Sequence, residues 1–222
     1  MSEDIIKKLI QKMFEKQDEL NIHTNGLDWK QNKNLKWYRA IWTECAELID
    51  YTDWKWWKKE DFKLDDIKIE LIDIWHFIMS GMMENTDIDT CVDTTIKNFK
   101  YFFEIDNPVS PQEIQSRTEE LAFFTLRNCK CCIEEFVKLC SSVNMDIEDI
   151  YKLYMGKNIL NRFRQDFNYK KGTYKKIWNG KEDNFYLIQY INNIQEIDNN
   201  FGKKIYDHLK ECYEKWCIDY KY

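Results

Sequence analysis

Two pairs of acidic residues are the strongest chemical signal in this sequence. Glu44 and Glu47 form the first pair, and Glu70 and Asp73 form the second. Each pair has i, i+3 spacing, which places both side chains on one face of a helix. Both pairs stand among apolar residues, and acids are rarely buried unless a positive charge compensates them. Four such acids on two facing helices predict a site for hard divalent cations such as Mg²⁺, which take oxygen ligands.

These acids could instead lie on the exposed faces of amphipathic helices, paired with lysines. The segment from Ile67 to Met79 argues against this, because its apolar residues occur on every side of a helix. Glu70, Asp73 and His76 are its main polar interruptions, and they form one stripe at intervals of three residues. Because burying unpaired acids is costly, we prefer the metal site.

A second group of residues combines positive charge with aromatic rings, in the segment from about 156 to 184. Helical periodicity is lost from about Asp166 onward, and Gly172 and Gly180 indicate turns. Such a segment could be a solvated basic loop or a nucleic-acid patch. Beside four acids for metal, its cations favour binding of a nucleoside triphosphate. Its charged and aromatic members include Lys157, Arg162, Arg164, Tyr169, Lys170, Lys171, Tyr174, Lys175, Lys176, Trp178 and Lys181.

The composition predicts an all-α helical bundle that carries the two acid pairs on facing core helices. The chain has 222 residues, is 44% hydrophobic, and contains only two prolines and six glycines. One sizeable core fits this length, so we expect a single domain over 1–222. The net charge of −6 argues against a general nucleic-acid or membrane-surface binder. Apolar periodicity predicts helices at about 5–20, 35–51, 64–83, 90–104, 112–141, 147–164, 185–197 and 205–216.

The N-terminus and the cysteines predict a cytoplasmic protein. Residues 1–18 already form a charged amphipathic pattern rather than a signal peptide. No apolar run approaches the roughly 18–20 residues that span a bilayer, so we expect no membrane segment. Without a secretory signal, the eight cysteines point to a reducing compartment. The C-x-x-C of Cys129 and Cys132 could bind zinc together with Cys212 and Cys217, but their loose spacing favours ordinary thiols.

Several longer motifs resemble the dimeric dUTPases, a branch of the all-α nucleoside triphosphate pyrophosphohydrolases, and in particular the Campylobacter-type bacterial enzymes. The likeness runs from about Gln17 to Asn184. Its motifs are Glu44-Cys-Ala-Glu-Leu-Ile-Asp50, Trp54-Lys-x-Trp57-Lys, Glu70-x-x-Asp73-Ile-Trp-His-Phe77, Gly156-Lys-Asn-x-Leu-Asn-x-Phe-Arg-Gln165 and Tyr169-Lys-x-Gly172-x-Tyr174-Lys-Lys-x-Trp178-Asn-Gly-Lys-Glu-Asp-Asn184.

The resemblance implies a homodimer that hydrolyses dUTP, and also dUDP, and so limits uracil incorporation into DNA. In this interpretation Glu44, Glu47, Glu70 and Asp73 hold Mg²⁺. Glu47, or alternatively Glu44, orients the attacking water. The candidates for binding phosphate are Lys157, Asn161, Arg164, Tyr174 and Lys175. The candidates for binding uracil and deoxyribose are Gln17, Asn21, Trp57, His76 and Asn158.

Other interpretations stay open. His76 could bond a carboxylate instead of touching the base, and Trp57 could be a packing residue like its neighbours Trp54 and Trp56. A related pyrophosphohydrolase acting on dCTP or a modified nucleotide would share the acid pairs. Asp73-x-x-His76 superficially resembles an element of ferritin-like iron bundles, although a second such element is missing from the sequence. A helical interaction protein without activity would leave the buried acids unexplained.

Overall fold

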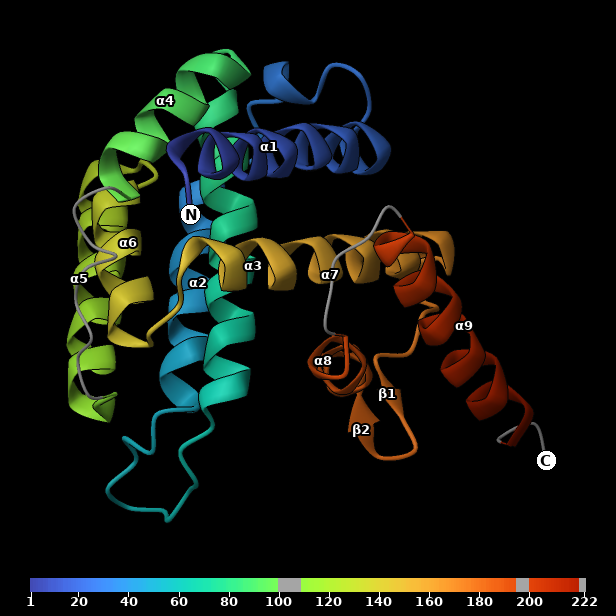
Figure 1. Ribbon diagram of the computed structural model, residues 1–222. Coiled ribbons are helices and arrows are strands. Elements are labelled where there is room, and N and C mark those ends of the chain that lie inside the picture. The colour runs from blue at the N-terminus through green and yellow to red at the C-terminus, as the bar shows by residue number, and fades with distance from the viewer. Residues whose placement is uncertain (100–108, 195–199, 220–222) are drawn as a thin grey trace. The chain divides into compact units, whose positions relative to one another are not determined.

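The computed structural model describes residues 1–99, 109–194 and 200–219 (Figure 1). As expected, the fold is all-α, and the strands in these residues form only one two-residue antiparallel ladder. In chain order the elements are α1 (Glu3–Asn25), η1 (Trp29–Gln31), α2 (Trp37–Asp50), α3 (Leu64–Met83), α4 (Ile88–Phe99), α5 (Pro111–Asn128), α6 (Ile133–Ser142), α7 (Ile147–Asp166), η2 (Tyr169–Lys171), β1 (Ile177–Trp178), β2 (Lys181–Glu182), α8 (Asp183–Asn192) and α9 (Phe201–Asp219).

The helix expected over 112–141 is wrong as a single element. The structure forms two helices, because Cys129 adopts a left-handed conformation with φ 50° and ends α5. The next helix, α6, begins only at Ile133, after the remaining cysteines of the cluster. The helix expected over 64–83 coincides with α3. The helices expected over 90–104 and 185–197 extend into residues outside the described ranges.

Contacts divide the chain into two compact units, Met1–Tyr151 and Lys152–Tyr222. The expectation of one domain stays a prediction. Among the helices that the structure describes, none is both long and apolar enough to cross a membrane.

The core of the first unit is built around Trp75 of α3. The Trp75 ring stacks on Phe136 of α6 with 5.0 Å between ring centroids. It also makes edge contacts with Phe14 of α1 and Phe99 of α4, and all four rings are buried. Burial of such large apolar surfaces is the main favourable term in folding. The Trp75 side chain of α3 therefore packs against three other helices, α1, α4 and α6.

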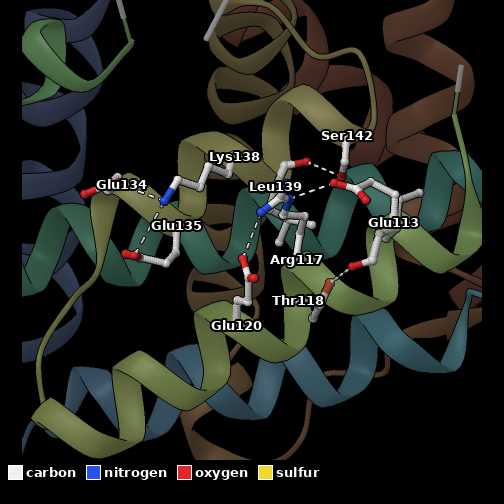
Figure 2. A network of polar contacts seen from close by, with 10 residues as sticks. Glu113, Arg117, Thr118, Glu120, Glu134, Glu135, Lys138, Leu139 and Ser142 are labelled. Atoms are coloured by element: carbon white, nitrogen blue, oxygen red, sulfur yellow. Dashed lines mark hydrogen bonds and ion pairs between the residues drawn. The ribbon is translucent and has the colours of Figure 1, made fainter. Parts of the chain in front are cut away.

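Ion pairs run along α5 and α6 beside this core (Figure 2). The Ser110 side chain accepts a hydrogen bond from the Glu113 backbone N–H at the start of α5, and Pro111 follows as the first helical residue. Arg117 then pairs with Glu113 at 2.8 Å along the same helix. Lys138 pairs with Glu134 at 2.8 Å on α6. Such exposed pairs contribute only about 0.3–0.5 kcal/mol each, so they support helices that packing already holds.

The second unit packs aromatic side chains between α7, the β1–β2 hairpin and α9. Phe163 of α7 contacts Tyr174, Trp178 and Tyr213 with ring centroids about 6 Å apart, and all four side chains are buried. The expected turns at Gly172 and Gly180 are present, with φ of 74° and 75°. In the hairpin the turn residues are Asn179 and Gly180, both with positive φ, as a tight two-residue connection requires.

Candidate active site

Helices α2 and α3 lie side by side in the first unit and carry the acid pairs (Figure 1). The carboxylate oxygens of Glu44, Glu47 and Glu70 all lie within 4.8 Å of one another. Glu70 is buried at 6% exposure, Glu44 and Asp73 are half-buried, and Glu47 is exposed. Solvent is therefore largely excluded from Glu70 and partly from Glu44 and Asp73, whereas Glu47 is open to it.

The surroundings of the Glu44 carboxyl raise its pKa to about 8. Burial is the largest cause, followed by the negative charges of Asp73, Glu70 and Glu47, and by a hydrogen bond with Glu70. The other three acids thus all act on Glu44. Without a cation, the site holds a proton at neutral pH to relieve this repulsion.

The donor set fits a divalent cation. Carboxylate oxygens are the ligands of hard cations, and a group of mutually repelling acids gains most from positive charge. Within the residues described, this is the one group of three or more acidic, histidine or cysteine side chains whose ligand atoms converge in this way. The described cysteines are all free thiols, and Cys45 beside Glu44 has a pKa raised to about 12, mainly by burial.

A buried polar network lies on the next turns of α3, where it meets α1. The amides of Gln17 and Asn21 donate to the Ser80 hydroxyl oxygen at 3.0 and 2.9 Å. Gln17 also donates to the Asn21 side-chain oxygen at 3.2 Å, and the Ser80 hydroxyl donates to the His76 carbonyl oxygen. The structure brings two of the predicted base-binding residues together. The His76 ring donates from Nδ1 to the Ile72 carbonyl oxygen at 2.8 Å.

Trp57, a further candidate for base binding, lies in the loop between α2 and α3. Its ring makes edge contacts with Trp54 and Trp56, and it is 56% exposed. Lys55 pairs with Asp50 at 3.0 Å and with Glu60 at 3.5 Å, which fixes the loop. The exposed ring of Trp57 is therefore available for stacking rather than committed to the core.

Four of the five predicted phosphate-binding residues belong to one hydrogen-bonded network in the second unit. Arg164 of α7 donates to the Asp183 carboxylate through Nε at 2.8 Å and Nη2 at 2.7 Å. The Tyr174 hydroxyl donates to the same carboxylate at 2.8 Å. Lys157 donates to the Asn184 side-chain oxygen at 2.8 Å, and Arg164 Nη1 donates to Asn161 at 3.3 Å.

Asn158 and Lys175 are the two remaining candidates of the second unit. The Asn158 amide donates to the Tyr154 hydroxyl oxygen at 3.1 Å, and Asn158 is buried at 5% exposure. Lys175 is exposed, and its backbone carbonyl accepts a hydrogen bond from the Trp178 indole at 2.7 Å. Lys175 is thus a surface cation on a fixed backbone.

Sequence reasoning assigned no role to Ser80, Asp183 or Asn184. Ser80 continues the polar stripe of α3 one turn beyond His76, so extending that stripe would have found it. Asp183 and Asn184 end the last of the motifs, but a motif does not show which neighbours an acid binds. Their pairing with α7 depends on the hairpin, which the sequence did not predict.

The fold and the acid cluster define an all-α protein with a carboxylate site suited to a cation. The family model for dUTPase matches residues 9–169, which include the acid pairs and all of α7. The chain therefore belongs to the dUTPase family, and it is an enzyme that hydrolyses dUTP. A search among curated proteins found no match.

Proposed function

We propose that this protein is a Mg²⁺-dependent dUTP diphosphatase that converts dUTP and water to dUMP and pyrophosphate. It also accepts dUDP, acts in the cytoplasm as a homodimer of the dimeric dUTPase type, and limits uracil incorporation into DNA. The observation that carries this proposal is the convergence of the Glu44, Glu47 and Glu70 carboxylates within 4.8 Å in a chain of the dUTPase family, because such a group of acids is suited to a divalent cation.

In this proposal Glu44, Glu47, Glu70 and Asp73 hold the metal. When bound, Mg²⁺ supplies positive charge to the triphosphate and makes the attacking water more acidic. Glu47 orients that water, because it is the exposed member of the cluster and can reach solvent. Glu44 is the second candidate for this role. Its burial and its hydrogen bond with Glu70 suit it better to holding charge than to moving protons.

The proposed substrate contacts fall into two groups by residue chemistry. In the second unit Lys157, Asn161, Arg164, Tyr174 and Lys175 offer N–H and O–H donors, and most carry positive charge, which suits phosphate oxygens. In the first unit, the Gln17 and Asn21 amides offer paired donors and acceptors for a pyrimidine edge, and Trp57 offers a ring for stacking. His76 and Asn158 complete the proposed contacts to the base and sugar.

The proposal is tested by product analysis with purified protein. dUTP, dUDP, dCTP and dTTP are each incubated with Mg²⁺ or with EDTA, and the products are separated by chromatography. We expect dUMP and pyrophosphate from dUTP, dUMP and phosphate from dUDP, and loss of both reactions in EDTA. Faster turnover of dCTP than of dUTP would instead indicate a related pyrophosphohydrolase. The same preparation on a calibrated sizing column tests the dimer.

A further inference from the structure

Asp183 is a fully buried carboxylate at the start of α8 that accepts three hydrogen bonds from charged or polar side chains. Two come from the Arg164 guanidinium and one from the Tyr174 hydroxyl, all between 2.7 and 2.8 Å. Burial alone would raise the pKa of Asp183, but the hydrogen bonds and charge of Arg164 outweigh it and lower the pKa. The carboxylate is therefore ionised, and a buried charge in this position is stable only while its partners stay in place.

The same residue fixes the backbone on both sides of Lys175. The hydroxyl of Tyr174, the preceding residue, binds the Asp183 carboxylate. The carbonyl oxygen of Lys176, the following residue, accepts a hydrogen bond from the Asp183 backbone N–H at 2.8 Å. Lys175 itself is exposed. The exposed Lys175 side chain therefore lies between two residues, Tyr174 and Lys176, that both form hydrogen bonds with Asp183.

Asp183 also sets the orientation of the Arg164 guanidinium. A bidentate pair through Nε and Nη2 fixes the plane of the group. It directs Nη1 to the Asn161 side chain, while the neighbouring Asn184 accepts from Lys157. The donors on α7 are therefore ordered before substrate arrives, which lowers the entropy lost on binding.

We propose that Asp183 is a positioning residue for dUTP hydrolysis, which orders Arg164, Tyr174 and Lys175 for contact with the phosphate chain. This inference rests on the proposed phosphate-binding role of those three residues. Asp183 itself touches no substrate, since its carboxylate is buried and occupied by its partners. It acts through the groups that it holds.

The test is a double-mutant cycle on steady-state kinetics with dUTP and Mg²⁺. We expect Asp183→Asn to raise KM for dUTP about tenfold or more, with a smaller change in kcat, because the loss falls on phosphate binding. Arg164→Gln should do the same. The double variant should be no worse than the more impaired single variant, because one residue acts through the other. Additive losses, or wild-type KM in Asp183→Asn, would overturn the proposal.

Two controls separate positioning from general support of the fold. Asp166→Asn changes an exposed acid at the end of α7, which accepts from the Tyr206 hydroxyl at 2.8 Å, and should leave KM unchanged. Mg²⁺ affinity, measured by calorimetry, should also be unchanged in Asp183→Asn, since the acid cluster is intact.

If Asp183→Asn does not fold, Asp183→Glu still decides the matter. It keeps the buried negative charge but moves the carboxylate by one methylene group, so folded protein with a raised KM supports the proposal and an unchanged KM refutes it. Wild-type protein that fails to hydrolyse dUTP would refute the proposed function itself, which is a different result.

Discussion

The side chains of Glu44 on α2 and Glu70 on α3 share a hydrogen bond, although both residues are acids. Two carboxyl groups can bond in this way only while one of them carries a proton. The raised pKa of Glu44 indicates that Glu44 is the protonated partner near neutral pH. A cation that binds these acids must displace this proton, so metal binding and proton release are linked.

We predict that the stability of the metal-free protein falls as pH rises from about 4.5 to about 8. The Glu44 pKa is near 8 in the folded state and near its ordinary value of 4.5 in the unfolded chain. Between these values the folded state binds more protons, so each rise in pH favours unfolding. The loss should be on the order of a few kcal/mol. Thermal melts of Glu44→Gln in EDTA should show a much weaker decline over this range, and an equal decline would exclude Glu44 as its source.

We predict that Glu47→Gln abolishes hydrolysis and leaves the fold intact. Removal of one charge from a crowded acid cluster should not destabilise the metal-free protein, because like charges there oppose one another. Loss of the group that orients water should lower kcat by about a hundredfold or more. Circular dichroism and turnover are measured on the same sample. Glu119→Gln, an exposed change on α5, is the matched control. Wild-type kcat in Glu47→Gln would remove this residue from the mechanism.

We predict that Mg²⁺ raises the thermal midpoint and that Glu70→Ala or Asp73→Ala removes most of this gain. A ligand that binds only the native state stabilises it by about 2.7 kcal/mol at a hundredfold excess over Kd. Differential scanning calorimetry at millimolar Mg²⁺ measures the shift. Glu134→Ala on α6 should retain the full gain, because its partner is Lys138 rather than the cluster. A melting curve that Mg²⁺ does not move would contradict the metal site.

We predict that Ser80→Ala destabilises the protein by about 1–3 kcal/mol, which is the usual cost of leaving buried polar groups unsatisfied. The Ser80 hydroxyl oxygen accepts from both Gln17 and Asn21, and the variant leaves their amides without this acceptor. Urea unfolding measures the change. Ser141→Ala on α6, where the hydroxyl donates to the Val137 carbonyl oxygen, is the control and should cost less. Equal losses would mean that the α1–α3 network contributes nothing of its own.

The helices that hold the acids could be predicted from the sequence because their signals are local. Apolar residues on every side of 67–79 indicate a buried helix where α3 lies, and i, i+3 spacing is sufficient to put Glu44 and Glu47 on one face. The break at Cys129 could not be predicted in this way. Cysteine is not a residue that usually adopts a left-handed conformation, yet Cys129 does so with φ 50°.

The second unit shows the other limit of sequence reasoning. Concentrated lysines and tyrosines correctly indicate a departure from helix between Asp166 and Asn184. They do not indicate that Tyr174 and Trp178 are buried, or that Arg164 is paired with Asp183 nineteen positions later. Those contacts depend on the chain reversal at Asn179 and Gly180. These are tertiary contacts, and the periodicity and composition of the sequence do not predict them.

Gly156 in the middle of α7 is constrained by its neighbours in space. The side chains of Leu187 and Ile191 on α8 fill the volume that a Cβ at this position would need. The two helices can therefore approach closely only because this residue has no side chain, and α8 begins at Asp183. In a saturation library selected for dUTP hydrolysis, position 156 should favour glycine, because any larger residue must displace the ends of the Leu187 and Ile191 side chains. At position 180 a Cβ would meet no neighbouring atom within 4 Å, and the only constraint is the positive φ of 75°. This position should therefore also accept asparagine, which tolerates positive φ better than most residues.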